Sequence, residues 1–383
     1  MTTRVTILGS TGSIGRNALE VITSLGNGYQ ATGLSAHRQC GALIEQARRF
    51  RPTTVAVSDR HRGLQVRHRL NGSTELLLGP DGLVELIRRP DSDYVINAIV
   101  GAAGLPATLE AARLGKSIGI ANKETLVVAG ELITNVSKET GATIYPIDSE
   151  HSAISQCVRA GDMKEVVKIY LTASGGPFRT WSSRQIENAT LEDALRHPTW
   201  RMGPKITIDS ATMMNKALEI IEAKWLFGLD ADQIEVLVHP ESIIHSMVEF
   251  CDGSFIAQMG APDMRIPIQY ALTHPRRAPA SGQRLNVKLL RRMNFEPPDH
   301  ERFPALELGY VVARKGGTSG AVLNAANEAA VDAFQSGTIP FPKIVELSRD
   351  ILRRHDLVTS PTLEQLMAAD EWARNEVKEC LRY

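Results

Sequence analysis

The stretch Val5-Thr6-Ile7-Leu8-Gly9-Ser10-Thr11-Gly12-Ser13-Ile14-Gly15 decides how the first half of the chain folds. Its first four residues predict a buried strand, and Ile14, Ala18 and Val21 then recur at helical spacing. A glycine-rich turn between a strand and a helix is typical of a dinucleotide-binding unit, in which glycines allow a tight turn and close approach to a pyrophosphate. The predicted cofactor-binding residues are Gly9, Ser10, Thr11, Gly12, Ser13, Ile14 and Gly15.

The glycine spacing and the end of the next strand refine this prediction. The spacing is G-x-x-G-x-x-G rather than the commoner G-x-G-x-x-G, so a glycine-rich turn without a ligand stays an alternative. An NAD site usually places an acid after the second strand, whereas this chain has His37, Arg38 and Gln39 there. Arg38, together with His37, suits a 2′-phosphate, which favours NADP over NAD. A solvated arginine is the alternative for Arg38.

Apolar runs alternate with amphipathic stretches over the first 148 residues. After the strand at 5–8, further strands are expected at 31–36, 54–58, 94–100, 117–121 and 143–147. Helices between most of these strands indicate a doubly wound parallel sheet. The later pattern is α+β, with strands expected at 166–173, 205–208, 234–238, 243–250 and 254–259 and a long helix at 211–227.

The predicted fold class is α/β, divided into four segments. We expect a Rossmann-like domain with a doubly wound parallel sheet at 1–148 and a central α+β catalytic domain at 149–272. Residues 273–303 are rich in Pro and Arg and are expected to form a linker. Residues 304–383 are expected to form a C-terminal helical bundle.

The composition of the 383 residues, 43% hydrophobic and 22% charged, is that of a soluble globular protein. Lys+Arg and Asp+Glu are each 43, so a zero net charge argues against a nucleic-acid-binding surface. The four cysteines (Cys40, Cys157, Cys251 and Cys380) have no metal-site or CxxC spacing, which fits a reducing compartment. No apolar run reaches transmembrane length, and a strand starts near the first residue. We therefore expect a cytoplasmic protein without a membrane partner.

Carboxylates at two places in the chain suggest a divalent metal. Asp148-Ser149-Glu150 follows the expected 143–147 strand, and ligands of open α/β sheets bind at such strand ends. Glu150 points the same way as Asp148 if the chain stays extended. On the long helix, Asn215 and Lys216 lie four and three residues before Glu219, so the three share one face. Carboxylate oxygens suit Mg²⁺ or Mn²⁺ better than zinc, and unrelated surface acids are the alternative.

Other residues suit a phosphate and a mobile lid. Ser174-Gly175-Gly176-Pro177 follows a strand, and its hydroxyl and amides suit a phosphate. Ser210 is expected at the start of the long helix, where it would cap that helix or bind an anion. His197, Trp200 and Met202 lie on a connection with Pro and Gly, which suits a lid. The alternative is a surface loop with Trp200 packed inward.

Eight motifs occur in one order along the chain. They are Gly9-Ser-Thr-Gly-Ser-Ile-Gly15, Ala121-Asn-Lys-Glu124, Asp148-Ser-Glu-His151, Ser174-Gly-Gly-Pro-Phe178, His197-Pro198, Asp209-Ser-Ala-Thr-Met-Met-Asn-Lys216, Gly260-Ala-Pro-Asp-Met-Arg265 and Leu323-Asn-Ala-Ala-Asn-Glu328. Through them the chain resembles the 1-deoxy-D-xylulose 5-phosphate reductoisomerase family nearly from end to end. It departs at His37-Arg38-Gln39, where some members have Gly-Lys-Asn, and at Ala173, where some have Gly.

The resemblance implies an NADPH-binding N-terminal domain, a central catalytic and dimerisation domain, a helical C-terminal domain and a homodimer. It implies that Asp148, Glu150 and Glu219 bind Mg²⁺, Mn²⁺ or Co²⁺. It adds Asn122, Glu124 and Gly203 to the cofactor-binding residues. The implied substrate-binding residues are Lys123, Ser149, Glu150, Ser174, His197, Trp200, Met202, Ser210, Asn215, Lys216 and Glu219. The implied catalytic residues are Lys123, Asp148, Glu150, His197 and Glu219.

The implied reaction rearranges a small sugar phosphate, 1-deoxy-D-xylulose 5-phosphate, by retro-aldol cleavage and re-addition. Reduction by NADPH then gives 2-C-methyl-D-erythritol 4-phosphate, in the non-mevalonate synthesis of isoprenoid precursors. One alternative is another two-domain NADP dehydrogenase, such as a homoserine or a semialdehyde dehydrogenase. The semialdehyde enzyme would need Cys157 as a nucleophile, and that residue lacks an activating context. A nucleotide-binding regulatory protein without catalysis is the alternative from another class.

Overall fold

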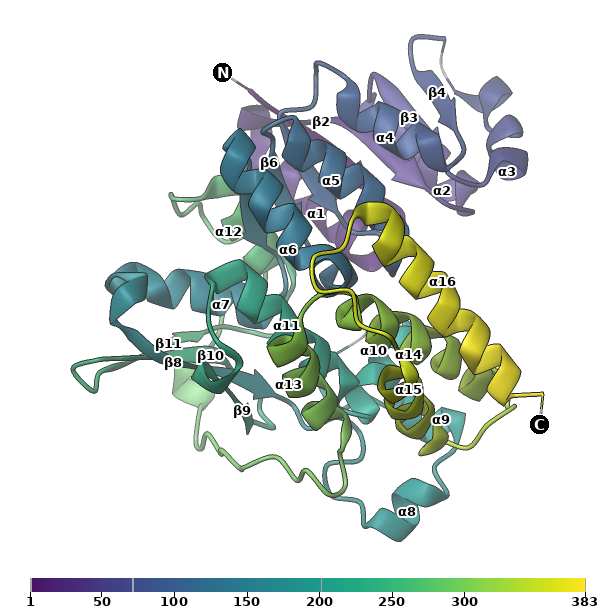
Figure 1. Cartoon of the computed structure of the whole chain (residues 1–383). Coiled ribbons are helices and arrows are strands. Elements are labelled where there is room, and N and C mark those ends of the chain that lie inside the picture. The colour runs from purple at the N-terminus through teal and green to yellow at the C-terminus, as the bar shows by residue number, and fades with distance from the viewer. Residues whose placement is uncertain (1, 71, 201, 383) are drawn as a thin grey trace. The chain divides into compact units, whose positions relative to one another are not determined.

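The computed structural model describes residues 2–70, 72–200 and 202–382, which divide into two compact units. The first unit comprises Met1–Thr125, Ile133–Ser152 and Asp263–Arg284. The second unit comprises Leu126–Leu132, Ala153–Pro262 and Leu285–Tyr383. Each unit has its own β-sheet (Figure 1). The expected division into four segments stays a prediction.

The first unit contains a parallel seven-stranded sheet in the order β4-β3-β2-β1-β5-β6-β7. The strands are β1 (Thr3–Leu8), β2 (Tyr29–Ala36), β3 (Thr54–Val57), β4 (Glu75–Leu78), β5 (Tyr94–Asn97), β6 (Ser117–Ile120) and β7 (Thr143–Pro146). This confirms the predicted doubly wound sheet. The edge strand β4 was not predicted, because its run Glu-Leu-Leu-Leu is short and lacks β-branched residues.

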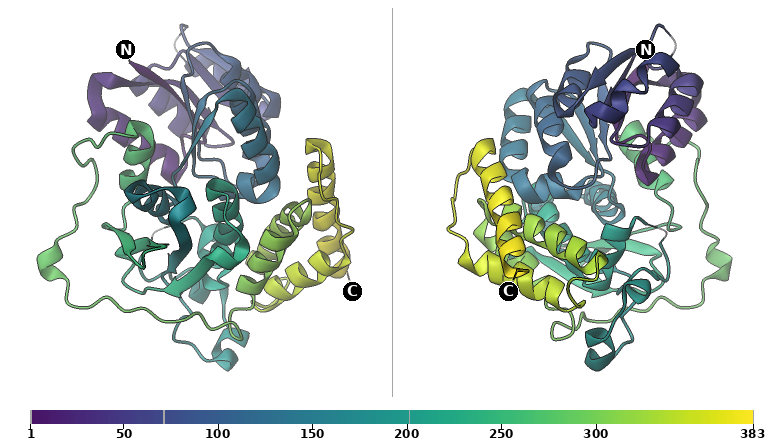
Figure 2. Two further views of the ribbon diagram at one scale, coloured as in Figure 1. Left: turned by 60° about the vertical axis from the view of Figure 1, so that its left-hand side comes forward. Right: turned by 90° about the vertical axis from the view of Figure 1, so that its right-hand side faces the viewer.

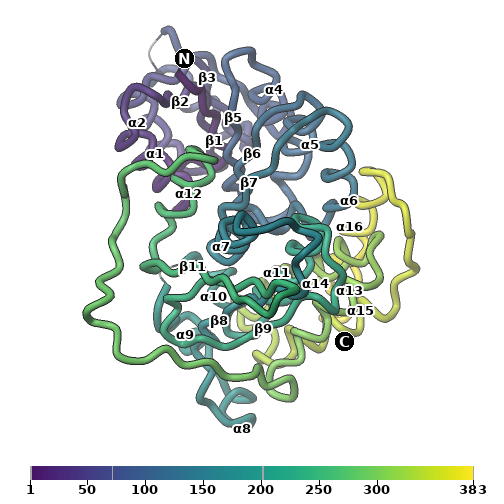
Figure 3. The backbone as a smooth tube through the Cα atoms, turned by 90° about the vertical axis from the view of Figure 1, so that its left-hand side faces the viewer, coloured from purple at the N-terminus to yellow at the C-terminus, as the bar shows by residue number. Residues whose placement is uncertain are grey.

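Helices cover both faces of this sheet. Its helices are α1 (Ser13–Leu25), α2 (Cys40–Phe50), α3 (Arg60–Leu64), α4 (Pro80–Arg88), α5 (Leu105–Arg113) and α12 (Arg265–Thr273), and α6 (Lys123–Thr140) and α7 (Ser149–Cys157) begin in this unit. On one face, α1, α2 and α12 share a core with Ile96 of β5, and Figure 3 shows α12 beside α1. On the other face, α4 and α5 pack against Val95, which directly precedes Ile96 in β5. Alternate residues of a strand therefore pack into two separate hydrophobic cores, one on each face of the sheet.

The second unit contains a four-stranded sheet in the order β11-β10-β8-β9. The strands are β8 (Val166–Ala173), β9 (Ile234–Val238), β10 (Ile244–Phe250) and β11 (Phe255–Met259). Strands β10 and β11 form the antiparallel hairpin that Cys251-Asp252-Gly253 predicts, and β8 pairs in parallel with β9. The end of β8 leads into Ser174, so this sheet presents the predicted phosphate loop.

In the second unit, helix α11 packs against β8 and β9, and further helices continue to the C-terminus. The helices of this unit are α8 (Ser183–Glu187), α9 (Leu191–Ala194), α10 (Pro204–Ala211), α11 (Met214–Phe227), α13 (Ala305–Lys315), α14 (Ser319–Gln335), α15 (Lys343–Arg354) and α16 (Leu363–Cys380). Figure 2 shows the C-terminal helices, coloured green to yellow, gathered together. This confirms the predicted C-terminal helices. Among the described residues, no helix combines the length and the apolarity needed to cross a membrane.

Two expectations for this region were wrong. The predicted strand at 205–208 is part of helix α10. Pro204 favours a helix start, because its fixed φ suits the first helical position. The four residues after it are too few to distinguish the periodicity of a strand from that of a helix. The long helix starts at Met214 rather than at 211. Met213 has a left-handed backbone (φ 62°) that separates the two helices. Ser210 therefore lies inside α10 and does not cap α11.

Candidate functional site

The glycine turn between β1 and α1 leaves room only for backbone. Gly9 has φ +77°, and a Cβ atom there would lie 2.7 Å from the carbonyl oxygen of Ala98. A Cβ atom on Gly15 would lie 2.4 Å from the carbonyl oxygen of Gly9. Gly12 precedes α1 without a side-chain cap, so the first turn of the helix keeps amides for an anion. These features fit the pyrophosphate of a dinucleotide.

The ends of β2 and β3 carry the residues that are predicted to contact the 2′-phosphate of the cofactor. Ala36 pairs with Val57, so the residues that follow each strand lie opposite one another. The Nδ1 atom of His37 lies 3.0 Å from the Oγ of Ser58, and the Nε of Arg38 lies 3.5 Å from a carboxylate oxygen of Asp59. The Arg38 side chain is 70% exposed, so its terminal nitrogens face solvent. Gln39 directly precedes helix α2.

Asp59 lies beside Arg38 and is an acid to which the sequence analysis assigned no role. The amide of Arg62 donates a hydrogen bond to its carboxylate. That bond, followed by the charge of Arg38, lowers the pKa of Asp59. The carboxylate therefore stays ionised beside Arg38. It lies after the third strand rather than the second, where NAD sites usually have their acid.

Asn122, Lys123 and Glu124 start helix α6 at the end of β6. The Asn122 side chain accepts from the amide of Thr125 and donates to the carbonyl of Gly101 and to Glu124. Asn122 is thus the N-cap of α6. All three motif residues are buried. Their positions are therefore fixed by the fold at the carboxyl end of the sheet, where ligands of such folds bind.

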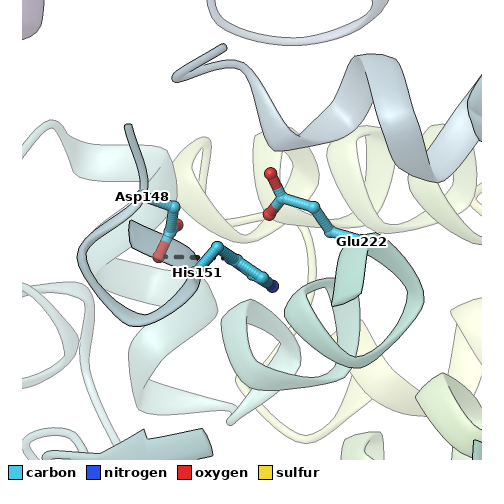
Figure 4. Close-up of side chains that lie close together, drawn as sticks. All are labelled: Asp148, His151 and Glu222. Carbon is cyan, nitrogen blue, oxygen red and sulfur yellow. Dashed lines mark ion pairs between the residues drawn. The ribbon is translucent and has the colours of Figure 1, made fainter. Parts of the chain in front are cut away.

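Asp148 follows β7 and forms a buried ion pair with Lys123. The Lys123 Nζ atom lies 2.6 Å from one carboxylate oxygen, and the Nδ1 of buried His151 lies 3.6 Å from the other (Figure 4). Burial by itself raises the pKa of Asp148, but the charge of Lys123 and the contact with His151 outweigh it. The pKa is held well below its usual range. Asp148 is therefore a carboxylate, as a metal ligand must be.

Glu150 does not continue an extended chain after Asp148. Residues Ser149–Cys157 form helix α7, and the Ser149 hydroxyl donates to a carboxylate oxygen of Glu150 at 2.6 Å. The extended-chain condition was wrong because the backbone carbonyl of Asp148 accepts the amide of Ser152, which starts the helix. Asp148 and Glu150 are both only partly buried. Both carboxylates remain candidates for a metal.

In the second unit, Ser174 and His197 contact each other directly. The Ser174 Oγ lies 3.0 Å from the His197 Nε2 and accepts from the amide of Gly176 at 3.1 Å. The amides of Thr199 and Trp200 both donate to the His197 Nδ1, at 3.1 and 2.9 Å. A ring nitrogen that accepts carries no proton, so Nδ1 is bare and Nε2–H is the donor. Burial lowers the pKa of His197 to about 4, which keeps this neutral form.

The rest of the predicted lid is only partly buried. The Trp200 ring centroid lies 6.2 Å from that of His245, on β10, and the Trp200 side chain is half-buried. Met202 is partly buried and Gly203 is exposed. Arg201 lies outside the described residues. Trp200 thus has a neighbouring ring in this unit, and the lid stays a prediction.

Helix α11 presents Asn215, Lys216 and Glu219 on one face, as their spacing predicts. The side chains of Asn215 and Lys216 both donate to the carboxylate of Glu219. Lys216 and Glu219 are 3% and 1% exposed, so this is a buried ion pair. One turn further, α11 carries a second fully buried acid, Glu222 (Figure 4).

The predicted phosphate residues lie on neighbouring segments of this unit. A Cβ atom on Gly176 would lie 2.4 Å from the carbonyl oxygen of Ser210, so the 174–177 loop packs directly on the end of α10. Only glycine allows this approach, and Gly176 also has φ +68°. The structure therefore places Gly176, two residues after Ser174, against the backbone of Ser210.

Two buried residues of the eight sequence motifs, His151 and Asp209, had no predicted role. His151 contacts Asp148, and the motif Asp148-Ser-Glu-His151 was the available signal. Asp209 is 1% exposed and contacts Lys205 and Asn327. Its motif gave a signal as well, but its partner Asn327 is 118 residues away in the chain.

Comparisons with known proteins identify the family. Three family models match: 1-deoxy-D-xylulose 5-phosphate reductoisomerase over residues 5–130, its C-terminal domain over 144–227, and the DXP reductoisomerase C-terminal domain over 259–376. The 1-deoxy-D-xylulose 5-phosphate reductoisomerase of Chloroherpeton thalassium is 54% identical, covering 98% of this chain and 97% of the relative. The chain belongs to the 1-deoxy-D-xylulose 5-phosphate reductoisomerase family.

Solved reductoisomerase structures have the same fold. The Zymomonas mobilis enzyme in complex with NADPH is 43% identical, with a TM-score of 0.93 over 100% of this chain and 99% of the other. A reductoisomerase in complex with NADPH, fosmidomycin and magnesium is 39% identical, with a TM-score of 0.94 over 99% and 98%. This membership confirms the predicted resemblance. It excludes the homoserine and semialdehyde dehydrogenase families.

Proposed function

We propose that the chain converts 1-deoxy-D-xylulose 5-phosphate into 2-C-methyl-D-erythritol 4-phosphate, with NADPH and a divalent metal, in non-mevalonate isoprenoid synthesis. The observation that carries the proposal is the 54% identity to a named reductoisomerase over 98% of the chain, with each predicted motif in place. Related structures in complex with NADPH and magnesium support the two cofactors. The chain is thus an NADPH-dependent oxidoreductase that also isomerises its substrate.

As the family resemblance implies, the residues that would hold the metal are Asp148, Glu150 and Glu219. Oxygen donors suit Mg²⁺ and Mn²⁺, and Co²⁺ also accepts them. A bound divalent ion supplies Lewis-acid stabilisation of negative charge on substrate oxygens. Lys123 contacts Asp148, so it holds this ligand ionised and adds a positive charge beside it.

NADPH binds along the first unit. The backbone amides of Gly9–Gly15 would hold the pyrophosphate, and His37 and Arg38, with Gln39 next to them, would hold the 2′-phosphate. The family resemblance adds Asn122 and Glu124, which are buried, and Gly203 to the residues that would contact the cofactor. Bound NADPH supplies the hydride for the reduction step.

The substrate phosphate is bound in the second unit by Ser174, Ser210, Asn215 and Lys216. His197 donates a hydrogen bond to the substrate through its Nε2–H, because its Nδ1 already accepts two backbone amides. The neutral imidazole therefore binds and orients the substrate, and it has no ring nitrogen available to take up a proton. Binding energy at the phosphate, remote from the reacting carbons, holds the substrate for both steps.

Lys123 and Ser149 contact the carbon skeleton of the substrate, together with Glu150. Both Lys123 and Ser149 are buried, so their positions are set before substrate arrives. Trp200 and Met202 cover the bound substrate and keep water from the reactive intermediate. The lid thus protects the rearranged aldehyde until it is reduced.

One assay tests this function. NADPH oxidation is followed as the loss of absorbance at about 340 nm, at about neutral pH. The substrate is 1-deoxy-D-xylulose 5-phosphate, and the assay is run with and without Mn²⁺. We expect turnover only when substrate and metal are both present, and mass spectrometry should identify the reduced product. Metal-independent NADPH oxidation, or NADPH oxidation with a semialdehyde but not with the sugar phosphate, would refute the proposal.

We also propose a homodimer that works in the cytoplasm. The edge strand β11 exposes Phe255, Ile256 and Met259, at 53%, 37% and 39%. An exposed apolar edge is stabilised when a second copy covers it. Light scattering should give twice the 41.9 kDa chain mass, and Ile256→Lys should shift it toward the monomer. The four cysteines are free in the structure, which fits a reducing compartment.

A further inference from the structure

Asp209 is a buried carboxylate on the helix that carries Ser210. Lys205, one turn earlier on α10, places its Nζ 2.7 Å from one oxygen of Asp209. Asn327, on α14, places its Nδ2 2.9 Å from the other oxygen. Asp209 and Asn327 are 1% and 0% exposed. A carboxylate only accepts hydrogen bonds, so the amide of Asn327 must point its nitrogen toward Asp209.

The hydrogen bond from Asn327 to Asp209 leaves a buried polar atom of Asn327 without a hydrogen bond from the described residues. The Oδ1 of Asn327 is buried and accepts no hydrogen bond from the described residues. A buried acceptor without a donor is unfavourable. The contact also joins α14 in the C-terminal part of the chain to α10, 118 residues earlier. Asn327 therefore fixes α10 from outside.

The position of α10 matters for the phosphate loop. A Cβ atom on Gly176 would lie 2.4 Å from the Ser210 carbonyl, so the loop and the end of α10 cannot move independently. Ser210 is the residue next to Asp209. A shift of α10 therefore displaces Ser210 and the 174–177 loop together.

We propose that Asp209 and Asn327 are positioning residues that set the substrate-phosphate site through Ser210 and Gly176. The C-terminal helices thereby take part in substrate binding without touching the substrate. This inference rests on the proposed function, since it assumes a phosphate at Ser174 and Ser210. A remote phosphate contact contributes mainly to binding rather than to the chemical step.

Helix α14 offers a matched control. Asn324 is also 0% exposed, its Oδ1 also lacks a donor among the described residues, and its Nδ2 also donates to a carboxylate. That carboxylate belongs to Glu328 on the same helix, 3.2 Å away. Replacing Asn324 therefore removes a similar buried amide whose hydrogen bond stays within α14.

The test compares Asn327→Ala with Asn324→Ala in the full-length enzyme. We expect Asn327→Ala to raise KM for the sugar phosphate about tenfold, with kcat within about twofold of the parent, and Asn324→Ala to change neither. Binding of inorganic phosphate, followed by ³¹P NMR without NADPH or metal, should weaken only in Asn327→Ala. Equal effects of both substitutions, or unchanged KM and phosphate binding in Asn327→Ala, would overturn the inference.

A second variant covers the case in which Asn327→Ala does not fold. Asp209→Asn keeps the side-chain shape and removes the charge that Lys205 and Asn327 hold, and we expect the same rise in KM. Unchanged KM in a folded Asp209→Asn enzyme would contradict the inference. Failure of the proposed function gives a different result, because the parent enzyme would then not turn over the sugar phosphate. The phosphate titration still decides the positioning role in that case.

Discussion

The Nε2–H of His197 donates a hydrogen bond to the Oγ of Ser174 across 3.0 Å, while the Nδ1 of the same ring accepts two amides of the lid. One imidazole therefore shapes the turn at 197–200 and joins it to the phosphate loop. In the proposed function, a phosphate oxygen would replace the Ser174 hydroxyl as the acceptor of the Nε2–H.

Two amide substitutions separate the functions of this ring. His197→Asn keeps an acceptor near the Nδ1 position and loses the distal donor, whereas His197→Gln keeps a donor near Nε2 and loses the local acceptor. We expect His197→Asn to raise KM at least about tenfold, because a hydrogen bond to a charged group contributes about 1.5–3 kcal/mol. His197→Gln should retain more affinity. Steady-state kinetics of both variants check this, and the opposite order would contradict the assigned tautomer.

The pH dependence of stability follows from the same group. Burial lowers the pKa of His197 to about 4, so the unfolded chain binds a proton between about pH 6.5 and 4 while the folded chain does not. The stabilisation from His197 is complete above that window and is lost as the pH falls through it. Urea unfolding at pH 7.0 and 5.0 should show a smaller loss of stability in His197→Gln than in the parent. An equal loss in both proteins would mean that His197 titrates normally.

Glu219→Gln should keep the fold and abolish metal-dependent turnover. The amide has the same shape but no charge, and loss of a carboxylate ligand should lower activity at limiting metal about 100-fold or more. Circular dichroism checks the fold, and Mn²⁺ titration by electron paramagnetic resonance checks the affinity. Unchanged activity at saturating substrate and limiting metal would exclude Glu219 as a ligand.

Arg38→Ala should reduce the preference for NADPH over NADH. The guanidinium supplies charge-assisted contacts to the 2′-phosphate, so we expect the ratio of the two kcat/KM values to fall about tenfold or more. Arg88→Ala is the control, because Arg88 is an exposed arginine of the same unit that pairs with Glu110. If the two variants keep the same coenzyme ratio, Arg38 does not read the 2′-phosphate.

The lid should become more enclosed when ligands bind. Trp200 is only half-buried against His245, so substrate, metal and NADPH can still remove water from its indole. In a variant that keeps Trp200 as its sole tryptophan, fluorescence emission should shift to the blue when NADPH, metal and a phosphonate substrate mimic are added. Emission that is already blue in the free enzyme, and that does not move, would show a permanently packed loop.

Local patterns predicted most of the fold. The run Val5–Leu8, the glycine turn and the helical spacing after it determine a βαβ start whatever follows. The same kind of reading failed at 205–208, because a short apolar alternation after Pro204 is compatible with either helix or strand. It also missed the helix at Ser149, which depends on a backbone hydrogen bond of Asp148 rather than on periodicity.

In the candidate site too, local contacts could be predicted from the sequence and long-range contacts could not. The shared face of Asn215, Lys216 and Glu219 follows from helical spacing alone. The contact of Asp209 with Asn327 and that of Ser174 with His197 depend on how distant segments fold together. The sequence shows that these side chains are polar and belong to motifs. Their partners lie far away in the chain, so a single sequence does not identify them.

The pairing of Ala36 with Val57 has a consequence for redesign of the coenzyme site. Because the two strands end level, His37 and Arg38 each have a counterpart on the neighbouring chain segment, Ser58 and Asp59. In the proposed cofactor site, coenzyme choice would therefore depend on these four residues rather than on Arg38 alone. A redesign toward NADH that removed only Arg38 would leave the ionised carboxylate of Asp59 in place.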